Sequence, residues 1–93
     1  MKVGDYFEEI DLNGWKFIFK LTLCYPSHII EPFTRNTRFV TAYSFEVVYS
    51  ESNDYKVGRC FHRHDGDLGW VEFMTQVDES KVESIVRNRR FGI

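Results

Sequence analysis

The chain has 93 residues, of which 43% are hydrophobic, 28% charged and 17% aromatic, and its 12 basic and 14 acidic side chains leave a formal charge of −2. This length predicts one globular domain over residues 1–93, and the near-neutral charge argues against a dedicated binder of duplex DNA, whose surface is strongly basic. No segment reaches the roughly 18 apolar residues of a membrane helix, and the acidic N-terminus argues against a signal or transit peptide, so we expect a cytoplasmic protein without membrane partners.

Asn13-Gly14 is the first strong structural signal, because this dipeptide readily adopts the two positive φ values of a type I′ hairpin turn. With these two residues as the loop, Ile10 pairs with Phe17 and Asp11 with Lys16. The core face in this register carries Tyr6, Ile10, Leu12, Trp15, Phe17, Phe19, Leu21 and Leu23, interrupted only by Glu8. The sequence therefore predicts an N-terminal hairpin with one apolar face.

A second alternation over residues 38–50 predicts a long strand, which places six side chains on one face: Phe39, Thr41, Tyr43, Phe45, Val47 and Tyr49. After a polar turn at 51–54, a third hairpin is expected from Tyr55–Arg63 and Trp70–Val77 around a loop at 64–69. Its period is irregular, so its inner face is not assigned.

The end of the chain changes to helical spacing, with apolar Val82, Ile85 and Val86 and with Asp78 or Ser80 available as the N-terminal cap. The pattern as a whole predicts an α+β fold. We expect an antiparallel β-sheet of about five strands, a meander of hairpins, packed with one C-terminal α-helix.

His62 and His64 are the strongest candidates for metal ligands, because residues two apart on a strand point the same way and Asp65 or Asp67 could add an oxygen. The other donors, His28, Cys24 and Cys60, have no spacing that forces them to converge on this pair. The same stretch also fits a hairpin loop in which glycines adopt positive φ and aspartates cap the turn. We therefore predict no metal centre and keep the histidine pair as a minor alternative.

Catalytic signatures are missing from the sequence, which has no GxSxG elbow and no glycine-rich phosphate loop. The cysteines have no CxxC spacing, so we expect two free thiols that are buried as small hydrophobic groups. These observations predict a protein without enzyme activity and without a cofactor.

Residues 24–37 form the segment that most suggests function, since we interpret them as a connection of about 14 residues without helical or strand period. Two prolines stiffen it, which lowers the entropy lost on docking. The expected partner-binding residues are Tyr25, Ile29, Ile30, Phe33, Arg35 and Arg38. The alternative is a loop that folds back over an open sheet face.

The expected function is a small protein-binding module that acts as an inhibitor or adaptor of a larger intracellular partner. By analogy of size alone, this includes blockers of host defence that phages or mobile elements encode. The alternative is a domain that binds single-stranded nucleic acid through aromatic side chains and Arg87, Arg89 and Arg90. A homodimer through an edge strand, either Tyr55–Arg63 or Tyr6–Leu12, is a further expectation.

Overall fold

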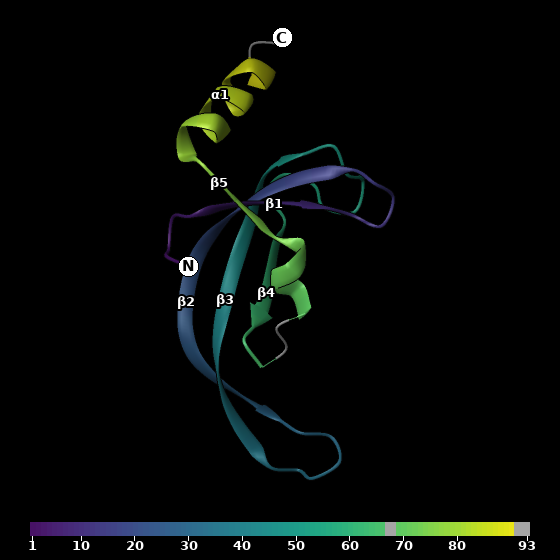
Figure 1. Cartoon of the computed structure of the whole chain (residues 1–93), viewed down its shortest axis with the longest axis vertical. Coiled ribbons are helices and arrows are strands. Elements are labelled where there is room, and N and C mark those ends of the chain that lie inside the picture. Colours follow the sequence, from purple (N-terminus) through teal and green to yellow (C-terminus); the bar gives the residue numbers. More distant parts are fainter. Residues whose placement is uncertain (67–68, 91–93) are drawn as a thin grey trace.

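The computed structural model describes residues 1–66 and 69–90, with the backbone alone at 88–90. Its elements are β1 (Tyr6–Ile10), β2 (Lys16–Ile30), β3 (Thr37–Ser50), β4 (Cys60–His64), the 3-10 helix η1 (Gly69–Phe73), β5 (Thr75–Val77) and α1 (Glu79–Arg90). The strands form one antiparallel sheet in the order β4-β3-β2-β1-β5 (Figure 1). The predicted α+β fold, with five antiparallel strands and one C-terminal helix, is confirmed.

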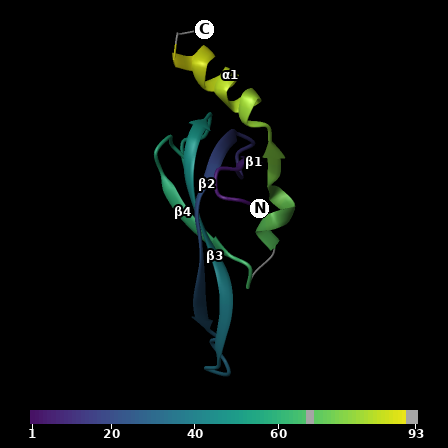
Figure 2. The same cartoon turned by 90° about the vertical axis from the view of Figure 1, so that its left-hand side faces the viewer.

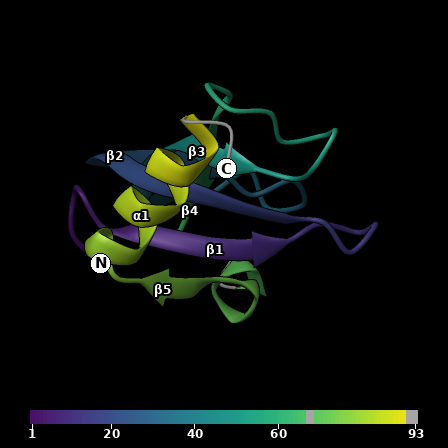
Figure 3. The ribbon, with the colours of Figure 1, turned by 90° about the horizontal axis from the view of Figure 1, so that it is seen from above.

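β5 departs from the simple meander, because it pairs with β1 at the opposite edge of the sheet from β4. The predicted hairpin between Tyr55–Arg63 and Trp70–Val77 is therefore wrong. Between β4 and β5 the chain forms η1, which carries Trp70 onto the aromatic core. Seen from above, β5 lies alongside β1 (Figure 3). Burial of the tryptophan thus takes the chain across the sheet instead of back along β4.

The N-terminal hairpin forms as predicted, but its register is shifted by one residue, since Ile10 pairs with Lys16. The Asp11 carbonyl accepts from the Gly14 N–H at 3.0 Å, and the Asp11 N–H donates to the Trp15 carbonyl at 2.9 Å. Gly14 has a φ of 87°. This is a three-residue hairpin loop that ends in a left-handed glycine, and Asn-Gly fits it as well as the two-residue turn.

The shift exchanges the two faces of β1, because successive side chains on a strand point to opposite sides. Phe7 and Glu9 face the core, whereas Ile10 and Leu12 are exposed. The predicted core face of β1 is therefore wrong. On β2 the expected face is correct for Phe17, Phe19 and Leu21, which are fully buried, but not for Leu23, which is exposed, and Ile18 on the opposite face is fully buried as well.

The main hydrophobic cluster lies on one face of the sheet and is largely aromatic. Its buried members are Phe7, Phe17, Phe19, Leu21, Phe45 and Val47, and Tyr43, Tyr55, Phe61, Trp70 and Met74 pack against them. The Phe19 and Phe45 rings meet edge to face at 5.1 Å, and Phe17 and Tyr55 stack at 4.2 Å. The alternation predicted for β3 thus supplies Tyr43, Phe45 and Val47 to the core.

An ion pair spans this face from β1 to β4. Both Arg63 Nη atoms donate to the Glu9 carboxylate, at 2.8 and 2.9 Å, and the guanidinium lies 5.0 Å from the Phe61 ring centre. β2 and β3 lie between these two strands in the sheet. The sheet must therefore curve strongly to bring the pair together, and the core sits in the hollow of that curve.

α1 begins directly after Asp78, one of the two predicted caps. The N-terminal part of the helix is the part that meets the sheet. Val82 is buried and Ile85 is half-buried, whereas Val86 is exposed. The rest of the helix extends beyond the strands (Figure 2). The apolar side chains of α1 therefore meet the end of the sheet and not a whole face of it. Within residues 1–66 and 69–90, no helix combines the length and apolar character needed to cross a membrane.

Candidate functional site

The segment predicted as a long loop is a β-hairpin arm, which we define as residues 23–41. Its sides are the outer parts of β2 and β3, which pair with each other from Pro26 opposite Thr41 to Ile30 opposite Thr37. β1 pairs with β2 only as far as Lys20, and β4 pairs with β3 only from Ala42. The arm therefore leaves the body of the sheet as a two-stranded ribbon (Figure 1). The prediction of an unstructured connection over 24–37 is wrong.

Pro26 lies inside β2, although a proline in a strand interior is unusual. Opposite it, Thr41 donates its N–H to Asp65 Oδ1 at 2.8 Å and accepts the Asp65 N–H at 3.0 Å. Both backbone groups of Thr41 therefore point away from β2. In such a pair the nitrogen of Pro26 faces the outer edge of the arm, where a missing N–H breaks no hydrogen bond between the strands.

A tight turn closes the arm. Glu31 donates its N–H to the Asn36 carbonyl at 3.0 Å, and Arg35 donates its N–H to the Glu31 carbonyl at 2.9 Å. Arg35 has a φ of 57° and is the only residue other than glycine with a positive φ in the described part of the chain. The left-handed conformation costs an L-residue about 1–2 kcal/mol. The turn therefore exposes Phe33 and Arg35, although glycine or asparagine would occupy position 35 with less strain.

The two faces of the arm differ in exposure. Tyr25, Ile29 and Val40 share one face, and a Cβ atom added to Gly66 would lie 3.0 Å from Val40 and 3.1 Å from Ile29. On the other face Ile30 is 66% exposed and Phe39 is 85% exposed, and Phe33 at the tip is 99% exposed. The loop after β4 thus packs on one face of the arm, and the opposite face and the tip present apolar side chains to solvent.

The six predicted partner-binding residues are divided by this arrangement. Ile30, Phe33, Arg35 and Arg38 are exposed, with Arg38 Nη1 donating to the Gly66 carbonyl at 3.2 Å; Tyr25 and Ile29 are half-buried. Phe39 is a surface residue that the sequence pattern did not indicate. Its alternation with Tyr43 and Phe45 correctly put it on the core face of β3, but the core ends before the arm begins.

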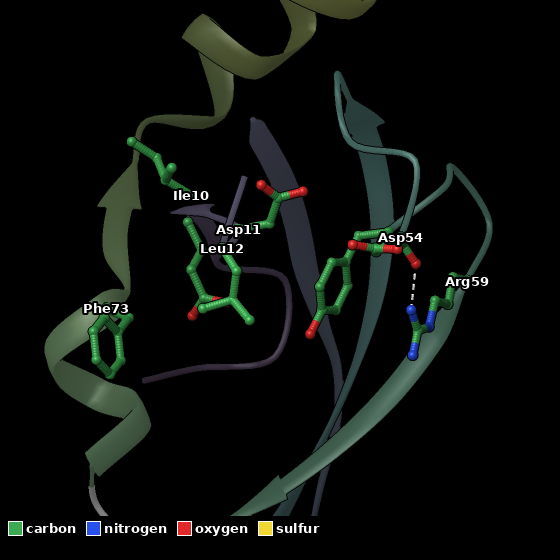
Figure 4. A pocket seen from close by; sticks show the side chains of 8 residues that line it. Ile10, Asp11, Leu12, Asp54, Arg59 and Phe73 are labelled. Atoms are coloured by element: carbon green, nitrogen blue, oxygen red, sulfur yellow. Dashed lines mark hydrogen bonds between the residues drawn. The ribbon is translucent and has the colours of Figure 1, made fainter. Parts of the chain in front are cut away.

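A groove lies between three loops far apart in the sequence. Its volume is about 770 Å³, and it is lined by Glu9, Ile10, Asp11, Leu12, Asp54, Tyr55, Arg59 and Phe73. In Figure 4, Phe73 and Arg59 lie on opposite sides of the groove with Leu12 between them. Leu12 is fully exposed, and Ile10 and Phe73 are more exposed than buried. The sequence held no signal for this groove, because the pairing of its loops depends on the tertiary fold.

Asp11 ties two walls of this groove together. Its Oδ1 accepts the N–H groups of Asn13 and Trp15, both at 2.9 Å, and its Oδ2 accepts the hydroxyl of Ser52. The hydrogen bond from the Ser52 hydroxyl is the main cause that lowers the pKa of the Asp11 carboxyl, and desolvation acts in the opposite direction. Instead of pairing with Lys16 as predicted, Asp11 holds the β1–β2 loop against the loop after β3.

Across the groove, Arg59 lies with its guanidinium 4.7 Å from the centre of the Tyr55 ring and donates to the Asp54 carbonyl. Tyr55 in turn stacks on the buried Phe17. This wall is therefore anchored to the core. The Asp54 carboxylate has no hydrogen-bond partner within the described residues and is exposed.

The described part of the chain contains no group of three or more His, Cys, Asp or Glu residues that could hold a metal ion. His62 Nδ1 lies 2.7 Å from the Ser44 hydroxyl, and His64 Nδ1 accepts the Gly66 N–H at 3.1 Å. Asp67, the other predicted oxygen ligand, lies outside the described residues. Cys24 and Cys60 are free, as predicted, but both are exposed, so their expected burial is wrong.

The remaining candidates lie apart from the arm. Arg87 on α1 is exposed, and the side chains of Arg89 and Arg90 lie outside the described residues. Of the two predicted edge strands, Tyr55–Arg63 contains β4, which is at an edge, whereas Tyr6–Leu12 contains β1, which lies between β2 and β5. The second of these predictions is wrong.

Exposed apolar side chains thus occur at the arm and at the groove, and others, such as Val57 and Val71, lie outside both. Comparison of the chain with protein-family models, with curated proteins and with solved structures found no match.

Proposed function

We propose that this chain is a small non-enzymatic protein-binding module, an inhibitor or adaptor of a larger intracellular protein, and that the arm is its principal contact. The observation that carries the proposal is the exposure of Ile30, Phe33 and Phe39 on one projecting hairpin. Single exposed apolar residues are ordinary on protein surfaces, but such residues gathered on one projection are typical of interaction sites.

The base of the arm is braced, which favours binding. Asp65 makes two hydrogen bonds with Thr41, and Arg38 reaches the Gly66 carbonyl from the packed face. A ribbon held in one conformation loses less entropy when it docks. Phe33 and Phe39 then act as aromatic anchors, and Arg35 lies beside them as a polar rim residue.

Side chains rather than strand pairing would carry the contact. Pro26 offers no N–H at the outer edge of β2, and Asp65 already satisfies both backbone groups of Thr41 at the edge of β3. The outer edges are thus interrupted at Pro26 and at Thr41, so a partner strand could not pair along the whole arm. We therefore expect the partner to provide an apolar pocket instead of an open sheet edge.

The test is affinity capture from a lysate of the organism that encodes the chain, with the partner read by mass spectrometry. The unaltered protein is compared with Phe33→Asp on the arm and Val57→Asp as a matched control, since Val57 is an exposed apolar residue outside the arm. We expect one dominant protein in the unaltered and control samples and its loss with Phe33→Asp. Circular dichroism checks that both variants remain folded.

The same capture is repeated with nuclease and at about 300 mM salt, which weakens phosphate contacts strongly. A protein partner that survives both treatments supports the proposal. If Phe33→Asp and Val57→Asp capture the same proteins equally, the arm is not the contact. If everything recovered disappears with nuclease, the alternative of single-stranded nucleic-acid binding replaces the protein-binding proposal.

A further inference from the structure

The tip of the arm and the groove have complementary surfaces. The tip presents Phe33 with Arg35 two residues later, and the turn holds both in place through the Glu31 hydrogen bonds. The groove presents apolar Ile10, Leu12 and Phe73 on one side and acidic side chains nearby. In the groove, the Phe33 ring would therefore meet apolar side chains, and the Arg35 guanidinium would meet acidic ones.

The charges of the two regions are opposite in sign. Glu9, Asp11 and Asp54 line the groove with Arg59 as its one cation. Glu9 and Asp11 are already held by Arg63 and Ser52, so Asp54 is the lining carboxylate that remains exposed and unpaired within the described residues. The arm carries Arg35 and Arg38 against a single carboxylate, Glu31. Such complementarity steers and orients association.

The groove cannot receive the arm of its own chain. Figure 1 shows the arm at one end of a molecule 53 Å long, with the loops around β1 in the other half. The hydrogen bonds of Asp65 and Arg38 fix the base of the arm to the loop after β4. A chain that carries both surfaces at separate ends is suited to meet a second copy in antiparallel orientation.

We propose that the arm of one copy docks in the groove of a second copy, with Phe33 against Leu12 and Phe73 and with Arg35 facing Asp54. In a two-fold dimer each contact occurs twice, which closes the assembly and doubles the buried surface. The proposal does not depend on the function proposed above, because it requires only this chain. It implies that self-association and a partner protein compete for the arm.

The test exchanges the charges of the proposed contact. Arg35→Glu places two carboxylates together in both contacts of its own dimer, and Asp54→Arg places two guanidinium groups together. Each variant alone should therefore be monomeric, with a dissociation constant raised by more than about tenfold, since like charges at an interface are strongly unfavourable. In an equimolar mixture both contacts again join opposite charges, so we expect a dimer of one copy of each variant.

Sedimentation equilibrium over about 5–500 μM measures the unaltered chain, each variant, their mixture and the control, and an affinity tag on one variant identifies the mixed dimer. Both residues are exposed, so loss of folding is not expected, and Lys81→Gln, an exposed cation outside the arm and the groove, is the charge control. A dimer of the unaltered chain that neither variant weakens uses another surface and overturns the proposal. A monomeric unaltered chain at the highest concentration also overturns it, and a series of larger species overturns the two-fold arrangement.

Capture of a partner separates this inference from the proposed function. Asp54→Arg leaves the arm intact, so it should bind a lysate partner at least as well as the unaltered chain while failing to dimerise. If dimers form as described and no partner is captured, the proposed function fails alone. If a partner is captured through Phe33 and no charge exchange restores a dimer, the self-association fails alone.

Discussion

The two halves of the β2–β3 hairpin have similar apolar content and opposite surroundings. In the inner half, Phe19 and Phe45 are fully buried beneath Phe61 and Trp70. In the arm, Phe39 lies on the same side of β3 as Phe45 and is 85% exposed. The strand is the same, and the difference is the cover that β1, β4 and η1 provide for the inner half only. An apolar face in the sequence therefore shows which side chains could be buried, but not whether other elements of the fold cover them.

Truncation of one aromatic residue in each half gives the largest expected contrast. Phe19→Ala leaves a cavity among packed rings and should lower the free energy of unfolding by roughly 3–5 kcal/mol. Phe39→Ala should change it by less than about 0.5 kcal/mol, because the ring is already in water. Urea unfolding followed by tryptophan fluorescence measures both. Equal losses would mean that the arm folds back onto an apolar surface in solution.

Loss of the ion pair across the inner half is expected to come next. Glu9→Gln leaves the Arg63 guanidinium without its carboxylate among aromatic rings, which should lower the free energy of unfolding by roughly 2–4 kcal/mol. Exposed Glu51→Gln is the control, with a change within about 0.5 kcal/mol.

The companion variant to this test replaces Glu9 and Arg63 together by leucine. It should recover much of the loss, since well-packed apolar residues can substitute for a buried pair. A double variant as unstable as Glu9→Gln would contradict the explanation based on the uncompensated charge. Thermal and urea unfolding of the four proteins decide the point.

Arg35→Gly at the arm tip is expected to act in the other direction. Glycine adopts positive φ without the cost that arginine bears, although it loses more freedom on folding, so stability should rise by roughly 0.5–1 kcal/mol. Thr34→Gly is the control and should lower stability, because Thr34 has no positive φ and its hydroxyl lies 3.2 Å from the Glu31 carboxylate. A loss of stability on Arg35→Gly would show that the side chain makes stabilising contacts in solution.

The smallest expected effect is on the free energy of unfolding at acidic pH. Because the folded pKa of Asp11 lies below its ordinary value of 3.8, its contribution is present above that value and is lost as pH falls through the folded pKa. Asp11→Asn should therefore flatten the stability curve below about pH 4, and Ser52→Ala should flatten it in part. Exposed Glu83→Gln is the control in acid titrations followed by circular dichroism. Parallel curves for Asp11→Asn and the unaltered chain would contradict the assignment.

Alternation predicted the inner half well, because a strand whose one face is buried repeats every two residues. Phe17, Phe19 and Leu21 on β2 and Phe45 and Val47 on β3 follow this rule. β1 did not, since Asn13-Gly14 is compatible with two loop lengths, and one residue of slip reverses every face. The pairing of β5 with β1 could not be predicted from the local sequence pattern, because it depends on where Trp70 is buried.

The segment expected to carry the candidate site does project from the sheet, but it is not the loop that the sequence suggested. The expectation came from the length of an apparent loop, whereas residues 24–30 are strand. Ile30, Phe33, Arg35 and Arg38 are exposed, and Phe39 completes the surface. The groove was not foreseeable, since Leu12, Asp54 and Phe73 meet only after three separate loops are in place.

Gly66 lies where the loop after β4 packs closely against the arm. A methyl group at this position would lie 2.9 Å from His64 Nδ1 and nearly as close to Val40 and Ile29, so even alanine would push against the arm. Substitution at Gly66 is therefore expected to change the angle between the arm and the body of the sheet, while the side chains that the arm exposes stay the same. Distances between spin labels on the tip and on α1 would report this angle.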